Sequence, residues 1–382
     1  METSEEILAK LISYPTISKD SNVQLINYVR DYLINYGIDS VLVSNVEKTK
    51  FNLYASIGPE KLGGILLSGH TDVVPVEGQD WTVDPFNLSR QGDRLYGRGT
   101  TDMKGFLACV LAMVPQAVIA KLNVPIHLVF SYDEEIGCIG IRRMLDVLEV
   151  DYARPKFCIV GEPTSMQIGI AHKGKVGMTC RCYGSSAHSA LTNEGLNAIY
   201  LACDMIAEIR KLHNDLSSGK LQEEFRVPHS TLHVGTIQGG TALNIIPNYC
   251  EFKFEIRNLE ADDSELLRKS LVNAAETIAN QYRHEFEDAN ICIEVFNQYP
   301  ALQLERDAEI INYVSDLLDK QEIIGIDFGT EAGIISSRLS VPAVVCGPGS
   351  MEQGHKANEY IQRSELERCD IFLSKLVHQL TQ

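Results

Sequence analysis

Five side chains that could bind metal ions each follow a short apolar run typical of a buried strand. They are His70 after GILLSG, Asp102 in GRGTTDMKG, Glu135 after IHLVFSYDE, Glu162 after KFCIVG and His355 after VPAVVCGPGSMEQG. In an open parallel sheet, the loops at the carboxyl ends of the strands converge on one crevice, so residues far apart in sequence can meet there. Two imidazoles and three carboxylates suit zinc, with cobalt or manganese as substitutes, and one carboxylate could bridge two ions. The sequence therefore predicts a metal-dependent hydrolase.

Two further carboxylates lie beside these candidate ligands. Asp72 follows His70 in SGHTDVVP and could accept the second ring N–H of a metal-bound histidine, which would orient the ring. In SYDEEIG three acids follow a strand directly, and their repulsion needs a cation or protons to relieve it. One acid of that cluster could bind a metal ion while its neighbour, Glu134, stays free as a general base.

Each motif taken alone has an ordinary structural explanation. A histidine in an HxD motif can be a satisfied surface residue, and a carboxylate at Asp102 can simply cap the helix that starts there. The GEPTS turn around Glu162 is unremarkable by itself, and the glycine-rich segment around His355 could be a flexible loop. The prediction depends on the five segments together.

The composition is that of a globular protein with an acidic surface. The chain has 382 residues and a formal charge of -17, and 45% of its residues are hydrophobic, so two domains and a sizeable core are expected. Scattered Lys and Arg residues form no basic stripe, which disfavours a nucleic-acid partner and favours a small polar substrate. No run of about 18 apolar residues predicts a membrane span, and the acidic N-terminus is unlike a secretory signal. We therefore expect a cytoplasmic protein.

The cysteines are expected to be buried thiols. The chain has ten, several of them inside apolar runs, and no two form a CxxC pair. Cys180 and Cys182 in the sequence CRC would point to one face of a strand, where they could bind a metal or be buried. The lack of a second thiol pair nearby favours burial.

Alternating strand and helix patterns predict an α/β fold, with a mostly parallel twisted sheet flanked by helices. Thr3 and Glu6 resemble a capping box that opens the first helix, which ends near Pro15. Further helices are expected at 23–36, 104–120 and 139–148. Strands are expected at 40–43, 52–57, 65–68, 126–132 and 157–161.

The rhythm changes in the middle of the chain. A strand at 176–183, a helix at 196–212, strands at 231–237 and 249–257, a helix at 264–283 and a strand at 291–296 give the βαββαβ order of a ferredoxin-like α+β domain. Residues 216–228 are polar and predict a loop. From about residue 301 the first pattern resumes, with a core strand in VPAVVCG and a closing helix from residue 364. We expect a catalytic metal-binding domain of residues 1–173 and 298–382, with residues 174–297 as an inserted domain.

Together the five motifs resemble the M20 family of metallopeptidases and deacylases, which includes acetylornithine deacetylase, succinyl-diaminopimelate desuccinylase, aminoacylase and carboxypeptidase G. The resemblance covers essentially the whole chain. It implies two zinc ions per subunit, with cobalt as a substitute: His70 and Glu162 hold one, Glu135 and His355 the other, and Asp102 bridges them.

The same resemblance implies roles for the neighbouring residues. Glu134 would be the general base, Asp72 would orient His70, and the Asp102–Met103 peptide bond would be cis. The inserted domain would act as a lid and form a homodimer.

Three residues of the inserted domain match family positions at the substrate site. His188 in GSSAHSA resembles the histidine that reaches the partner subunit's metal site and donates a hydrogen bond to the developing oxyanion. Arg257 resembles the arginine that binds the substrate carboxylate, and Asn244 in TALNIIP would line the same pocket. Without the motif context, His188 would be a surface residue and Arg257 a partner for a nearby glutamate. His172 and Lys173 resemble branch markers without a derivable role.

The stretches GEPTSMQIGIAHKGK, FGTEAGI and GPGSMEQGHKANEYI resemble the acetylornithine deacetylase branch. That resemblance implies hydrolysis of N2-acetyl-L-ornithine to ornithine and acetate in arginine biosynthesis. A zinc-activated water would give its proton to Glu134, which returns it to the leaving amine. Three alternatives stay open: a related deacylase of acetylcitrulline or succinyl-diaminopimelate, a dipeptidase, and a metal-binding scaffold without turnover. A candidate general base, Glu134, beside a complete set of ligands disfavours the scaffold without turnover.

Overall fold

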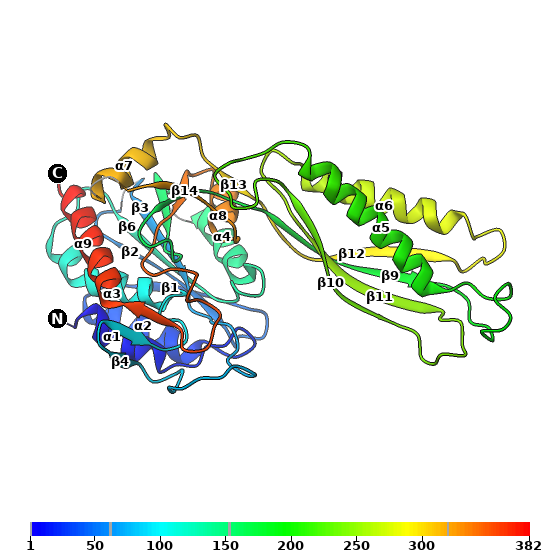
Figure 1. Ribbon diagram of the computed structural model, residues 1–382. Coiled ribbons are helices and arrows are strands. Elements are labelled where there is room, and N and C mark those ends of the chain that lie inside the picture. Colours follow the sequence, from blue (N-terminus) through cyan, green and yellow to red (C-terminus); the bar gives the residue numbers. More distant parts are fainter. Residues whose placement is uncertain (1, 61–62, 152–153, 319–320) are drawn as a thin grey trace. The chain divides into compact units, whose positions relative to one another are not determined.

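The computed structural model describes residues 2–60, 63–151, 154–318 and 321–382 (Figure 1). By their internal contacts, the residues divide into two compact units. The first comprises Met1–Ala171, Gln303–Gly325 and Thr330–Gln382, and the second comprises His172–Leu302 and Ile326–Gly329. This division gives Ile326–Gly329 to the second unit, although the sequence pattern placed that segment in the first domain.

The larger sheet has nine strands, most of them in the first unit. Its path runs through β1 (Ser40–Ser44), β2 (Phe51–Ile57), β6 (Ile126–Ser131), β3 (Ile65–His70), β7 (Phe157–Val160), β15 (Ala343–Val345), β8 (Ile168–His172) and β13 (Leu302–Gln303), and β14 (Ile323–Ile326) pairs with β8. The central strands β6, β3, β7 and β15 are parallel. Strand β1 pairs antiparallel with β2, β2 with β6, and β8 with β15. The predicted α/β fold with a mostly parallel central sheet is confirmed.

Helices flank this sheet, and in Figure 1 α1, α3 and α9 lie together while α4 and α8 form a second group. The helices of the first unit are α1 (Ser4–Ile12), α2 (Val23–Asn35), α3 (Lys104–Ile119), α4 (Ile139–Asp151), α7 (Glu309–Leu317), α8 (Ala332–Leu339) and α9 (Arg363–Gln379). The capping box that predicted α1 is present, because the Thr3 side chain accepts the Glu6 N–H and Glu6 accepts the Thr3 N–H. Helix α3 is apolar on nearly all sides and is buried among its neighbours, which fixes the position of the segment before it.

A small three-stranded sheet joins two segments that are far apart in sequence. Strand β16 (Tyr360–Gln362) pairs antiparallel with β5 (Arg94–Tyr96), and β5 pairs with β4 (Ser89–Gln91). The sequence pattern did not predict it, because three-residue strands carry no readable periodicity. Near β16, the loop that contains Gly349 comes so close to the segment before α3 that a Cβ atom on Gly349 would clash with the Thr101 hydroxyl.

The second unit has the predicted βαββαβ order. Its elements are β9 (Lys175–Tyr183), α5 (Ala198–Ser217), β10 (Thr231–Gly239), β11 (Tyr249–Arg257), α6 (Ser264–Asn280) and β12 (Asn290–Tyr299). The strands form a sheet in the order β10-β11-β9-β12 with antiparallel neighbours, and α5 and α6 lie along it (Figure 1). This arrangement confirms the ferredoxin-like prediction.

All ten cysteines are free, and most are buried. Cys180 and Cys182 belong to the hydrophobic core of the second unit, so burial of the CRC pair is confirmed. In the part of the chain that the structure describes, no helix has the length and hydrophobicity needed to cross a membrane.

Candidate metal centre

The five predicted ligands converge at one edge of the central sheet. His70 is the last residue of β3, Glu135 follows β6, Glu162 follows β7, and His355 lies in the loop after β15. Because these four strands are parallel neighbours, their carboxyl ends lie side by side. Asp102 comes from the segment just before α3. The peptide bond between Asp102 and Met103 is cis.

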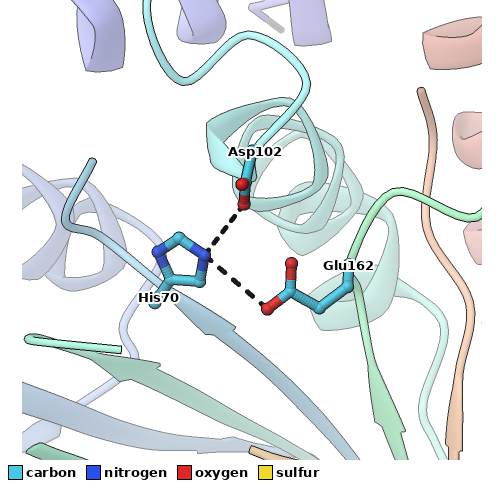
Figure 2. A group of neighbouring side chains, drawn as sticks. All are labelled: His70, Asp102 and Glu162. Atoms are coloured by element: carbon cyan, nitrogen blue, oxygen red, sulfur yellow. Dashed lines mark hydrogen bonds and ion pairs between the residues drawn. The ribbon is translucent and has the colours of Figure 1, made fainter. Parts of the chain in front are cut away.

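His70, Asp102 and Glu162 form the first donor group, called the inner group below. The His70 Nε2 atom lies 3.1 Å from Asp102 Oδ1 and 3.6 Å from Glu162 Oε1. Figure 2 shows the imidazole ring of His70, at the end of its strand, facing both carboxylates. All three side chains are buried. One nitrogen and two carboxylate oxygens therefore face a common point from which water is largely excluded.

Asp102, Glu135 and His355 form the second donor group, called the outer group below. The His355 Nε2 atom lies 3.1 Å from Asp102 Oδ2 and 3.1 Å from Glu135 Oε2. Glu135 Oε1 is buried and has no hydrogen-bond partner among the described residues, as expected of a ligand whose partner is an ion. Asp102 gives one oxygen to each group, so its carboxylate could bridge two ions.

The electrostatics of the two groups call for cations. Burial, together with neighbouring carboxylates, raises the pKa of Glu162 well above its usual range, and burial raises the pKa of Glu135 to about 7. Burial would also raise the pKa of Asp102, but hydrogen bonds from His355 and His70 lower it instead. Carboxylates packed this closely cannot all ionise without positive charge between them. The mixed N/O donor set thus fits divalent metal ions.

Asp72 supports the site in two ways, one of which the sequence did not indicate. The His70 Nδ1 atom lies 2.9 Å from the Asp72 backbone carbonyl oxygen and 3.6 Å from its carboxylate. The carboxylate accepts hydrogen bonds from Ser18 Oγ at 2.7 Å and from the backbone N–H groups of Glu134 and Glu135 at 3.1 and 3.3 Å. The carbonyl therefore makes the shorter contact with His70, while the carboxylate holds the loop of the acidic cluster.

Glu134 is buried beside the donor groups but belongs to neither. Its Oε1 atom accepts a hydrogen bond from Cys138 Sγ at 3.3 Å, and burial raises the pKa of Glu134 well above its usual range. The preceding residue, Asp133, has a left-handed backbone (φ 55°) and forms a 2.6 Å ion pair with Lys50. A carboxylate that belongs to neither donor group is therefore fixed next to Glu135, a predicted metal ligand.

The predicted substrate residues lie in the second unit, and neither donor group includes them. His188 is exposed, and its Nδ1 atom accepts the Ala190 N–H at 3.1 Å. Arg257 donates to Glu255 Oε1 at 3.0 Å and to the Tyr299 hydroxyl at 2.9 Å. Asn244 is exposed. The catalytic role of His188 and the substrate contacts of Arg257 and Asn244 stay predictions.

The two residues that resemble branch markers have contacts of their own. His172 is buried, and its Nδ1 atom lies 3.0 Å from the Lys173 carbonyl oxygen. The Lys173 ammonium donates to the His229 carbonyl at 2.7 Å. These contacts give both residues a structural role within the second unit.

The sequence analysis missed three buried charged residues beside the donor groups: Arg98, Glu331 and Glu359. Glu331 accepts hydrogen bonds from Ser131 Oγ at 2.6 Å and Ser68 Oγ at 3.4 Å, and burial raises its pKa to about 7. All three occur in motifs that the sequence analysis quoted. What marks these residues is that they are buried, and a sequence pattern does not show whether a charged residue in a loop is buried.

Comparisons with known proteins agree with this geometry. The model of the family described as "Peptidase family M20/M25/M40" matches residues 66–379. The acetylornithine deacetylase of Shigella sonnei (strain Ss046) is 34% identical, over 98% of this chain and 96% of that protein. An M20 family metallo-carboxypeptidase from Sulfolobus solfataricus has a TM-score of 0.80 at 17% identity, with 100% of both chains covered. The YXEP protein of Bacillus subtilis, described as a dinuclear metal binding peptidase, has a TM-score of 0.70 at 16% identity, with 98% of this chain and 96% of that chain covered.

Proposed function

Because the chain belongs to peptidase family M20/M25/M40 and is a metal-dependent amidohydrolase, we propose that it hydrolyses the acetyl amide of N2-acetyl-L-ornithine to ornithine and acetate. The observation that carries this proposal is the shared carboxylate of Asp102 between two donor groups, with Glu134 held unliganded beside them. The full-length similarity to a protein named acetylornithine deacetylase supports the substrate.

Two zinc ions are the proposed cofactor, with cobalt as a substitute. His70 and Glu162 would hold one ion, Glu135 and His355 the other, and Asp102 would bridge them. The YXEP protein, with the same fold, is described as a dinuclear metal binding peptidase, which supports two ions. When bound, such ions polarise the amide carbonyl and acidify a water molecule.

Glu134 is the proposed general base. A buried carboxylate with a raised pKa can take a proton from the attacking water and return it to the departing amine. Asp72 helps by fixing the His70 ring and by holding the backbone of the Glu134 loop. Arg257 and Asn244 are proposed to bind the substrate carboxylate and to line its pocket, and His188 to stabilise the oxyanion in the partner subunit's site.

A homodimer through the second unit is part of the same proposal. This unit exposes several large apolar side chains, among them Tyr200, Leu243 and Ile245. Exposed apolar residues gathered on one surface are typical of an interface between protein chains. A role in cytoplasmic arginine biosynthesis would follow from the proposed substrate, and it stays a prediction.

The experiment that tests this function measures amine release from N2-acetyl-L-ornithine by the purified protein, with added zinc or cobalt and with a chelated control. The panel includes N-acetylcitrulline, N-succinyl-diaminopimelate and dipeptides. We expect metal-dependent release, fastest with acetylornithine. Faster turnover of another substrate would assign the chain to a related deacylase or a dipeptidase. No turnover on any substrate by metal-loaded protein would contradict the enzymatic proposal and favour a metal-binding scaffold.

Glu134→Gln tests the base within the same assay. The amide keeps the size of the side chain but cannot take a proton, so we expect turnover to fall by about 10²- to 10⁴-fold. The bound metal content should stay the same. Unchanged turnover would assign the base to another residue.

A further inference from the structure

His355 differs from the other proposed ligands in its backbone and its exposure. Its side chain is 48% exposed, whereas those of the inner group are buried. Its backbone is left-handed, with a φ of 60°. The left-handed region is disfavoured for a residue other than glycine, so other contacts must hold His355 there. The position of His355 therefore depends on what contacts its loop.

Gln79 makes such a contact. Its side-chain amide donates from Nε2 to the His355 backbone carbonyl at 3.0 Å. The same amide accepts hydrogen bonds at Oε1 from Arg98 Nη2 at 2.5 Å and from Trp81 Nε1 at 3.1 Å. With both ends of the amide engaged, Gln79 presents its N–H group to His355 in a fixed direction.

The partners of Gln79 connect it to the segment that contains Asp102. Arg98 is fully buried and forms a 2.7 Å ion pair with Glu359 Oε2. Glu359 Oε1 accepts the backbone N–H groups of Gly99, Thr101 and Asp102 at 3.0, 2.9 and 3.2 Å. A continuous chain of hydrogen bonds thus joins the backbone of Asp102 to the backbone of His355.

We propose that Gln79 is a positioning residue for His355 and that, through the Arg98–Glu359 pair, it sets the affinity of the outer group for its metal ion. The inference rests on the proposed two-ion centre. Residues behind the ligands typically change metal affinity by about 10- to 100-fold when they are replaced. Gln79 donates directly to His355 of the outer group, and it is linked to the shared Asp102 only through Arg98 and Glu359. Its loss should therefore weaken binding of the outer ion more than binding of the inner ion.

The test compares Gln79→Met with the wild-type protein. Methionine has a similar length but lacks both the donor and the acceptor. Metal-free protein is titrated with zinc by calorimetry, and the cobalt-loaded protein is followed by its absorption spectrum. We expect the wild type to bind two ions and the variant to bind the inner ion unchanged and the outer ion about 10- to 100-fold more weakly.

Thr82→Val is the matched control. Thr82 belongs to the same segment as Gln79, and its hydroxyl and backbone N–H donate to Asn358 Oδ1 at 3.0 and 2.9 Å. The valine removes one contact between the same two segments and leaves the His355 contact in place, so both metal affinities should stay at the wild-type values. Gln79→Ala serves as a second variant with the expected effect of Gln79→Met.

The proposal would be overturned if Gln79→Met bound both ions with wild-type affinity. It would also be overturned if the variant bound both ions equally more weakly and had a lower Tm, or if the wild-type protein bound only one ion. None of these results involves a substrate. If Gln79→Met bound only the outer ion more weakly, but the wild-type protein did not hydrolyse acetylornithine, the proposed substrate would be refuted and this inference would stand.

Discussion

The inner and outer donor groups use the same kinds of ligand but differ in what holds them. His70, Asp102 and Glu162 adjoin β3, α3 and β7, and all three are buried. In the outer group Glu135 follows a left-handed turn, and His355 is half-exposed on a loop that polar side chains keep in place. The core packing thus fixes the inner group, whereas hydrogen bonds fix the outer one. We expect two ions of unequal affinity, with the inner ion bound more tightly.

Asp102→Asn should have the largest effect, because it removes charge from both groups at once. An amide oxygen is a weaker ligand than a carboxylate and cannot bridge two cations as well. We expect loss of both ions on dialysis and a fall in turnover of at least about 10³-fold. Elemental analysis and the acetylornithine assay measure the two effects. Asp80→Asn, at an exposed position, is the control, and retention of either ion at wild-type affinity in Asp102→Asn would contradict the shared role.

His355→Asn and His70→Asn compare the two groups directly. We expect His355→Asn to keep one ion per chain and to lose turnover by about 10²-fold, since the buried inner group remains complete. His70→Asn should lose more bound metal and more turnover than His355→Asn, because it leaves buried carboxylates without a cation. The measurement is metal content after dialysis against a weak chelator. If His355→Asn lost both ions and His70→Asn only one, the assignment of inner and outer affinity would be reversed.

The same difference explains how much of the site could be predicted from the sequence. Four of the predicted ligands lie at the end of apolar strands or follow them, and the sequence shows these strands as short apolar runs. They are His70, Glu135, Glu162 and His355. The parallel order of the strands then brings these residues together. The general base candidate followed from its place beside Glu135.

The supporting contacts could not be predicted in the same way. Glu359 and Arg98 meet across 261 positions of sequence, and the small sheet that joins their segments has strands of three residues. Nothing in a local pattern marks Glu359 as the acceptor for the backbone before α3. The left-handed backbone of His355 is likewise a tertiary feature, because the residue type does not favour it.

Glu331→Gln tests the polar layer behind the inner group. Burial raises the pKa of Glu331 to about 7, so in metal-free protein the folded state holds a proton that the unfolded state releases above its ordinary pKa of 4.5. The unfolded state then binds fewer protons, and stability falls as the pH rises from about 4.5 through 7, by up to about 3 kcal/mol for this group. Glutamine keeps hydrogen bonding to Ser68 and Ser131 without the charge. We expect the variant to be more stable than the wild type at pH 8 and equal to it near pH 4.

Urea unfolding of chelated protein across this pH range measures the effect. Glu77→Gln is a suitable control, because that carboxylate is exposed and forms an ion pair with the exposed Lys19. A lower stability of Glu331→Gln at pH 8 would show that the ionised carboxylate stabilises the fold, contrary to the prediction.

Lys50→Met should have the smallest effect on the centre. It tests whether the rate depends on the contacts that hold the loop of Glu134 and Glu135. The Lys50 ammonium pairs with Asp133 at 2.6 Å and donates to the Ser18 carbonyl, and Ser18 donates in turn to the Asp72 carboxylate. Burial raises the pKa of Asp133, and Lys50 opposes this effect, so without the lysine the pKa of Asp133 should rise further and the turn before Glu134 should lose its ion pair. We expect kcat to fall about 10-fold with KM and inner-ion content unchanged, because a misplaced base lowers the rate without affecting ground-state binding.

Lys50→Arg keeps the charge and should recover part of kcat, and Lys19→Met removes only an exposed ion pair and should leave kcat unchanged. A rise in KM with normal kcat in Lys50→Met would place the lysine at the substrate. Loss of the inner ion would show that the two groups share their support, and the distinction between a core-held and a hydrogen-bond-held half of the centre would then fail.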